Sequence, residues 1–195
     1  EKKRVAFHEA GHATISWLVE HAAPLLKVTI VPRGRSLGAA WYLPEERSLT
    51  TTEQMLDEMC ATLGGRAAEE VAFGNISTGA LSDLERVTKQ AQAMVTIYGL
   101  SENIGNISYY DSSGQSEYSF GKPYSEETAK VIDTEISKLI EEQYERAIHL
   151  LETNKEKLTQ LADILIEKEV IFKDDLETIF GKRPFDKEEQ IPAAE

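Results

Sequence analysis

The sequence predicts a mainly α-helical fold with a small β-hairpin or sheet and a C-terminal helical bundle. Apolar residues recur at helical spacing over most of the 195 residues, whereas only one short stretch is rich in β-branched residues. The last third carries a long amphipathic pattern of the kind that packs helices together. Apolar residues make up 41% and charged residues 28% of the chain, which is ordinary for a globular protein.

The elements of the first half follow in order. We expect a first helix over about 3–21, a strand over 27–32 that proline ends, a turn at 33–36 and a second strand over 37–44. A capping box within Thr50-Thr51-Thr52-Glu53 opens a helix that reaches about residue 73. A loop then leads to a helix over 82–98, for which Ser82 and Glu85 form a second capping box. The Gly-, Ser- and Asn-rich stretch 100–123 predicts an irregular or partly stranded segment.

The second half is predicted to be helical. Ser125 caps a long helix to about residue 152, whose apolar stripe consists of Ala129, Ile132, Ile136, Leu139, Ile140, Tyr144, Ala147 and Leu151. Thr153 and Glu156 cap the next helix, and a short helix follows over 173–180. The tail after Gly181 is expected to be frayed.

Charge and cysteine content restrict the function classes. The net charge of −13 argues against a nucleic-acid surface, which needs clustered Lys and Arg. A single cysteine excludes an internal disulfide and suits a reducing compartment. Without an apolar stretch near 18 residues or a signal-peptide pattern, these residues are expected neither to span a membrane nor to direct export.

The most informative motif is His8-Glu9-Ala10-Gly11-His12. On a helix, positions i and i+4 share one face, so both imidazoles can reach one zinc ion. A catalytic zinc keeps an open position for water, and Glu9, rotated by about 100° from His8, can lie beside that water and take its proton. This chemistry makes hydroxide near neutral pH and polarises a carbonyl, which suits peptide hydrolysis.

A chance surface pattern is the alternative interpretation. It is disfavoured because the flanking residues are apolar, because buried imidazoles need partners, and because Gly11 would let another segment approach closely. His21 lies about 180° round the helix from His12 and should not be a ligand. His149 is expected on the surface of a distant acidic helix.

A third metal ligand must come from another element. Cys60 has helical apolar neighbours and is expected to be a small core residue. Glu69, Glu70 and Asp83 are the carboxylate candidates, and an acid at position 83 would also favour the dipole of a helix that starts there. Spacing alone does not choose among the three.

The chain resembles the protease domain of the FtsH family of membrane-anchored, ATP-dependent zinc proteases. The resemblance covers about 5–125 and rests on ordered matches: Val5-Ala6-Phe7-His8-Glu9-Ala10-Gly11-His12-Ala13, Val28-Thr29-Ile30-Val31-Pro32-Arg33-Gly34, Leu37-Gly38, Tyr42-Leu43-Pro44, Leu63-Gly64-Gly65-Arg66-Ala67-Ala68-Glu69-Glu70, Ser77-Thr78-Gly79-Ala80, Ser82-Asp83-Leu84, Met94-Val95, Tyr98-Gly99 and Lys122-Pro123-Tyr124-Ser125.

The resemblance implies the site. His8, His12 and Asp83 would hold Zn2+, which places Asp83 above the two glutamates, and Glu9 would be the general base of a zinc-dependent endopeptidase. Residues 1–124 would then form the zinc-binding catalytic subdomain and 125–181 a C-terminal helical subdomain, with 182–195 a flexible tail.

The resemblance also implies a larger assembly. It implies a homo-oligomer, a closed six-fold ring, fed with unfolded, misassembled or membrane proteins by an ATPase module that uses ATP. No nucleic acid would be bound, and membrane contact would come only through segments outside this chain. The expected place is the bacterial inner membrane with this domain on the cytoplasmic side, or alternatively an organelle inner membrane facing the matrix.

Three further hypotheses concern substrate docking and rival functions. The stretch 37–42 is a strand with small residues at one end, where an extended peptide can add by main-chain hydrogen bonds, or else an ordinary hairpin strand packed on the first helix. Two rival classes are a scaffold with a structural zinc, which would have four protein ligands, and a zinc hydrolase acting on smaller molecules.

Overall fold

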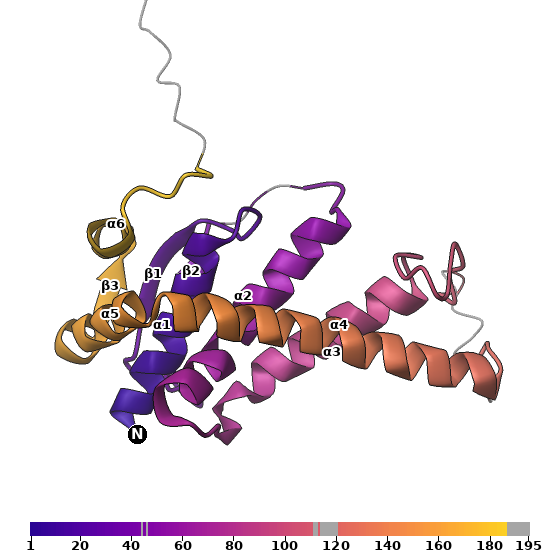
Figure 1. Ribbon diagram of the computed structural model, residues 1–195, viewed down its shortest axis with the longest axis horizontal. Helices are drawn as coiled ribbons and strands as arrows, with labels where there is room; N and C mark the ends of the chain where they lie inside the picture. The colour runs from indigo at the N-terminus through magenta and orange to yellow at the C-terminus, as the bar shows by residue number, and fades with distance from the viewer. Residues whose placement is uncertain (44, 46, 111–112, 114–120, 187–195) are drawn as a thin grey trace, which may run out of the picture.

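A computed structural model describes residues 1–43, 45, 47–110, 113 and 121–186. Helices dominate it, as predicted, in the order α1 (Lys2–Leu18), α2 (Thr52–Phe73), α3 (Leu81–Thr96), α4 (Glu126–Thr153), α5 (Lys155–Lys168) and α6 (Lys173–Phe180). Three short strands complete it: β1 (Leu25–Thr29), β2 (Ala39–Tyr42) and β3 (Val170–Phe172). Figure 1 shows α4 running along the longest axis of the molecule, with the sheet near one end. The described helices include none that is both long and apolar enough to cross a bilayer.

Helix α1 lies at the centre of the fold. Every residue from Ala6 to Trp17 is buried, because α2 and α5 pack on it and β1 covers a further part. Gly11 permits the closest of these approaches: a Cβ there would lie 2.2 Å from the Gly64 carbonyl oxygen and 2.5 Å from the Ala68 Cβ. The close approach expected at Gly11 is therefore confirmed, and it brings the middle of α2 against the histidine motif.

The predicted hairpin forms, and a third strand joins it. Strand β1 pairs antiparallel with β2 on one side and with β3 on the other, so that Val28 faces both Ala40 and Ile171. The third strand, β3, was not expected, because its three residues lie between two helices and carry too short a pattern to detect. The order β2–β1–β3 leaves β2 at an edge of the sheet.

Several predicted caps are displaced. The capping box of α2 is formed by Thr51 and Gln54, one residue later than the Thr50–Glu53 pattern suggested. The Ser82–Glu85 box is wrong, because Ser77 caps a 3-10 turn, Thr78–Ala80, that leads directly into α3.

The predicted cap at Thr153 is also wrong. Its hydroxyl donates back to the His149 carbonyl inside α4, and Asn154 occupies the N-cap position of α5, although its side chain makes no capping hydrogen bond to that helix. The amide of Asn154 donates instead to the Leu150 carbonyl, which terminates α4. The Ser125 cap of α4 is confirmed, because its hydroxyl accepts from the Thr128 amide.

Two apolar clusters hold these helices together. The larger joins α1, the sheet, α5 and α6 with parts of α2 and α4, and the smaller packs Met55, Met59 and Leu63 of α2 against α3 and α4. An ion pair between Arg146 and the buried Asp57, 2.7 Å apart, ties α4 to α2.

The remaining expectations fall partly outside the described residues. The structure does not describe Pro44 of the predicted second strand, residues 111–112 and 114–120 of the irregular stretch, or residues 187–195 of the tail. The described part of 100–123 contains neither helix nor strand, as expected. The division at residues 124 and 181 stays a prediction.

Candidate metal centre

Three side chains from two helices converge next to the centre of α1. The Nε2 atoms of His8 and His12 lie 3.2 Å apart, and one carboxylate oxygen of Asp83 lies 3.2 Å from the first and 3.3 Å from the second. One possible ligand atom from each of the three residues lies within 4.8 Å of the other two. Asp83 lies in the first turn of α3, directly after the 3-10 turn Thr78–Ala80. This position at the start of the helix brings its carboxylate to the two histidines of α1.

Both imidazoles are held by hydrogen bonds on their far sides. His8 donates from Nδ1 to Oε1 of Glu69 over 3.0 Å, and His12 donates from Nδ1 to the Ala61 carbonyl over 2.9 Å. Each bond places the proton on Nδ1, so the lone pair of Nε2 is directed at the convergence point. This is the usual arrangement around metal-binding histidines.

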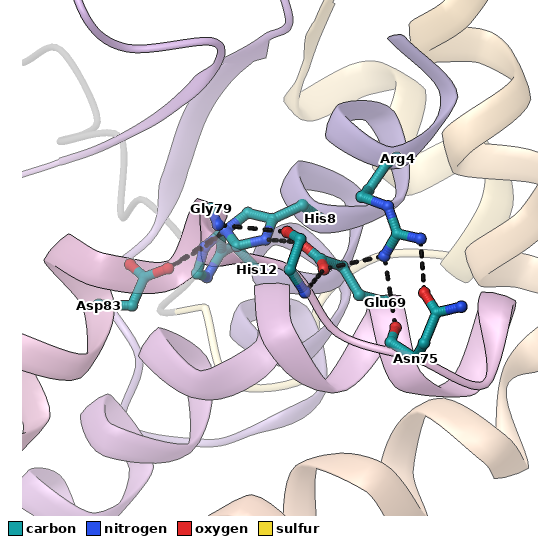
Figure 2. Close-up of polar contacts among 8 residues, drawn as sticks. Arg4, His8, His12, Glu69, Asn75, Gly79 and Asp83 are labelled. Atoms are coloured by element: carbon teal, nitrogen blue, oxygen red, sulfur yellow. Dashed lines mark hydrogen bonds and ion pairs between the residues drawn. The ribbon is translucent and has the colours of Figure 1, made fainter. Parts of the chain in front are cut away.

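Glu69 is the hub of the outer contacts. Its side chain is only 2% exposed, and besides His8 it accepts from the Ser77 amide at 2.8 Å, the Ser77 hydroxyl at 3.0 Å and Arg4 at 3.1 Å. Arg4 in turn donates to the Asn75 side chain at 2.6 Å. Figure 2 shows the resulting line of contacts from Asp83 through the histidines and Glu69 to Arg4 and Asn75.

The charges around the convergence point favour a cation. Burial would lower the pKa of His12, but its hydrogen bond to Asp83 and the nearby carboxylates raise it to about 9. Burial would raise the pKa of the Asp83 carboxyl, but the hydrogen bonds from His12 and His8 hold it well below its usual range. An environment that attracts a proton so strongly also attracts a divalent metal ion, which replaces that proton.

Glu9 lies beside this cluster with a different environment. It is 7% exposed, and burial raises the pKa of its carboxyl, although the neighbouring histidines oppose the shift. Its carboxylate does not belong to the cluster of possible ligand atoms formed by His8, His12 and Asp83. A raised pKa makes a carboxylate a better proton acceptor, which suits a general base.

The donor set and the space around it fit zinc. Two imidazole nitrogens and one carboxylate make three protein ligands, which is the number that a catalytic zinc site has. Gly65 of α2 forms one wall of this site: a Cβ there would lie 2.4 Å from His8 Nε2 and 2.6 Å from His12 Nε2. The space that a metal needs between the two nitrogens therefore exists because residue 65 lacks a side chain.

Gly65→Ala should lower zinc affinity by roughly 10–100-fold, the range typical of changes next to metal ligands. The added methyl group forces the imidazoles apart, whereas glycine-to-alanine replacement in a helix interior favours the helix itself. Zinc competition titration with a chromophoric chelator measures the change, and circular dichroism checks the fold. Gly79→Ala, whose methyl would have no neighbour closer than 3.3 Å, is the control; equal affinities in both variants would refute the steric argument.

The other predicted residues lie elsewhere. Glu70 is exposed and accepts a hydrogen bond from the Tyr144 hydroxyl, so it does not reach the cluster. Cys60 is fully buried in the core, and burial raises the pKa of its thiol to about 12. The imidazole of His21 lies 3.7 Å from Glu20, and His149 is exposed on α4.

Sequence reasoning did not identify the supporting residues Arg4, Ser77 and Gly65. A signal for the last existed: a Gly-Gly pair inside an otherwise strong helix pattern needs a packing or functional reason. No pattern marked the other two, because their role depends on where Glu69 lies.

Comparison with known proteins gives one family. The model for "Peptidase family M41" matches residues 1–179. An ATP-dependent zinc metalloprotease FtsH from Parabacteroides distasonis is 66% identical over 94% of this chain and 27% of the relative. One from Karelsulcia muelleri is 59% identical over 92% of this chain and 29% of the relative. The mouse (Mus musculus) mitochondrial inner membrane m-AAA protease component AFG3L2 is 51% identical over 95% and 23%. The chain thus spans about a quarter of the length of these relatives.

Proposed function

The chain belongs to peptidase family M41, and from this premise we propose that it is a zinc-dependent endopeptidase unit. His8, His12 and Asp83 hold the zinc ion, and Glu9 is the general base. The observation that carries the proposal is the convergence of two Nε2 atoms and one carboxylate oxygen at 3.2–3.3 Å from one another. The hydrogen bonds from both Nδ1 atoms support it, because they leave the Nε2 lone pairs free for a metal.

The reaction divides between the metal and the chain. When bound, zinc supplies Lewis-acid chemistry, which polarises a peptide carbonyl and lowers the pKa of water. Glu9 takes the proton from the attacking water at its carboxylate and later delivers it to the leaving amine. Glu69 holds His8 in the tautomer that binds metal, and Asp83 adds the negative charge that offsets the cation.

We extend the proposal to a longer protein, because this chain spans about a quarter of the length of its relatives. The names of the relatives state ATP dependence and, for the mouse protein, an inner-membrane location. We propose that the full protein is membrane-anchored with this unit on the cytoplasmic or matrix side. It would use ATP to feed unfolded, misassembled or membrane proteins to a homo-oligomeric ring of six such units, in the manner of protein quality control.

Substrate peptides dock along β2. This strand lies at an edge of the sheet, and its pairing with β1 uses only one side of its backbone. Its N-terminal end approaches Glu9, because Gly38 immediately precedes it and packs on that side chain. An extended peptide added to the free edge is held by main-chain hydrogen bonds whatever its side chains.

Ala39→Pro should lower peptide turnover by at least about tenfold, because proline removes an N–H group and fixes φ at the start of the edge strand on which the peptide would dock. Zinc content should stay at the wild-type value, since residue 39 contacts no proposed ligand. Hydrolysis of a fluorogenic peptide measures turnover, and Ala39→Ser, which keeps the N–H group, is the matched control. Unaltered turnover in the proline variant would remove β2 from substrate binding.

Chelation of the metal tests the proposed activity as a whole. Treatment with 1,10-phenanthroline should abolish hydrolysis of an unstructured peptide, and one equivalent of zinc should restore it. A panel of esters and small amides separates a peptidase from a hydrolase of smaller molecules. Rapid ester turnover with no peptide cleavage, or a zinc with four protein ligands, would favour the rival classes.

A further inference from the structure

Gly38 packs directly on the carboxylate of Glu9. A Cβ at position 38 would lie 2.7 Å from Oε1, 2.8 Å from Cγ and 3.0 Å from Cδ of that side chain. The first two distances are shorter than real Cβ contacts and the third is tighter than most of them, and they involve the stem of Glu9 as well as its tip. Rotation of the carboxylate alone would therefore not relieve them.

Backbone conformation does not explain the glycine. The described glycines with positive φ are Gly34, Gly74, Gly99, Gly105, Gly121 and Gly181, and Gly38 is not among them. Residue 38 thus has a backbone that other residues can adopt, so the contact with Glu9 is the reason for a residue without a side chain.

Packing is also the main restraint on Glu9. Both imidazoles of the metal centre are held by hydrogen bonds to Glu69 and the Ala61 carbonyl. Among the residues that the structure describes, by contrast, burial and the charges of His12, His8 and Asp83 act on the Glu9 carboxylate without a hydrogen bond, and the side chain is only 7% exposed. Its position therefore depends on what packs against it.

The backbone at Gly38 is itself fixed. Arg33 and Ser36 exchange two main-chain hydrogen bonds of 2.9 and 3.1 Å across the turn, and the Ser36 hydroxyl donates to the Gly38 carbonyl. Ala39, the next residue, pairs with Thr29 of β1. The turn and the sheet together hold the Gly38 backbone against α1.

We infer that Gly38 is a positioning residue that sets the place of the general base Glu9 by direct backbone packing. The inference rests on the proposed function of Glu9. It also places the base beside the start of the strand on which the substrate docks. The same hairpin therefore positions both the Glu9 carboxylate and the bound peptide.

A double-mutant cycle tests this positioning. Gly38→Ala should lower kcat for a fluorogenic peptide by about 100-fold, the loss expected when a reacting group is displaced by about 1 Å. KM and zinc content should stay within about twofold, because neither the edge of β2 nor the metal ligands change. In a Glu9→Ala background the Oε1, Cγ and Cδ atoms that a Cβ at position 38 would meet are absent, so Gly38→Ala should then change the residual kcat by less than about threefold.

The outcomes separate this inference from the proposed function. An equal loss from Gly38→Ala in both backgrounds, or no loss in the wild-type background, would overturn the positioning role while leaving the peptidase proposal intact. Full activity in Glu9→Gln would instead reject the proposed base. A crystal structure of the zinc-loaded Gly38→Ala variant gives a readout without activity: the carboxylate should be displaced, and an unmoved carboxylate would overturn the inference.

Discussion

Asp83→Ala should abolish stoichiometric zinc binding and, with it, peptide hydrolysis. The variant removes the only carboxylate oxygen that lies within 3.3 Å of both Nε2 atoms among the described residues. Two histidines on one helix then remain, which is fewer protein ligands than a catalytic zinc site has. The loss of affinity should exceed the roughly 100-fold that changes in outer contacts cause, as measured by zinc per chain after dialysis.

The two glutamates provide graded controls for this loss. Glu69→Ala leaves the ligands in place but frees the His8 ring and should weaken zinc by roughly 10–100-fold. Glu70→Ala should have no effect, because that carboxylate contacts Tyr144 on the exposed surface. Stoichiometric zinc in Asp83→Ala together with none in Glu69→Ala would exchange the roles assigned to these residues.

Glu9→Gln should lower kcat for peptide hydrolysis by roughly 10²–10⁴-fold, the contribution of a positioned general base. The amide has almost the same shape as the carboxylate but takes up no proton. Zinc should remain bound at one equivalent, since the Glu9 carboxylate does not belong to the cluster of possible ligand atoms. Single-turnover hydrolysis and metal analysis of the same preparation measure the two quantities together.

A matched substitution tests the specificity of this effect. Glu70→Gln makes the same chemical change at an exposed residue outside the metal centre and should keep the wild-type kcat. Retained proteolysis in Glu9→Gln would remove Glu9 from the mechanism, whereas loss of both zinc and activity would indicate that it supports the metal instead.

Patterns that depend on local sequence were predictable. The motif His8-Glu9-Ala10-Gly11-His12 placed two histidines on one face of a helix because i,i+4 spacing is a property of every α-helix. The bounds of α2, α4 and α6 were predicted to within two residues. The antiparallel hairpin was also expected, since proline and the turn at Arg33-Gly34 leave little alternative.

Features that depend on tertiary contacts were not predictable from spacing. Glu69 and Asp83 are both acids on helices, and only the packing of α1 between them decides that one meets Nδ1 of His8 and the other Nε2. The family resemblance, not the geometry of the sequence, favoured Asp83. The third strand and the steric roles of Gly38 and Gly65 were missed for the same reason, because each depends on a distant partner.

A crystal structure of the zinc-loaded chain, with anomalous data collected at the zinc absorption edge, tests the central claim most directly. The claim predicts one zinc ion bound by His8 Nε2, His12 Nε2 and the Asp83 carboxylate, with Glu9 beside it and unbound. Coordination by Glu69, or a folded chain with no anomalous peak at this site under excess zinc, would contradict it.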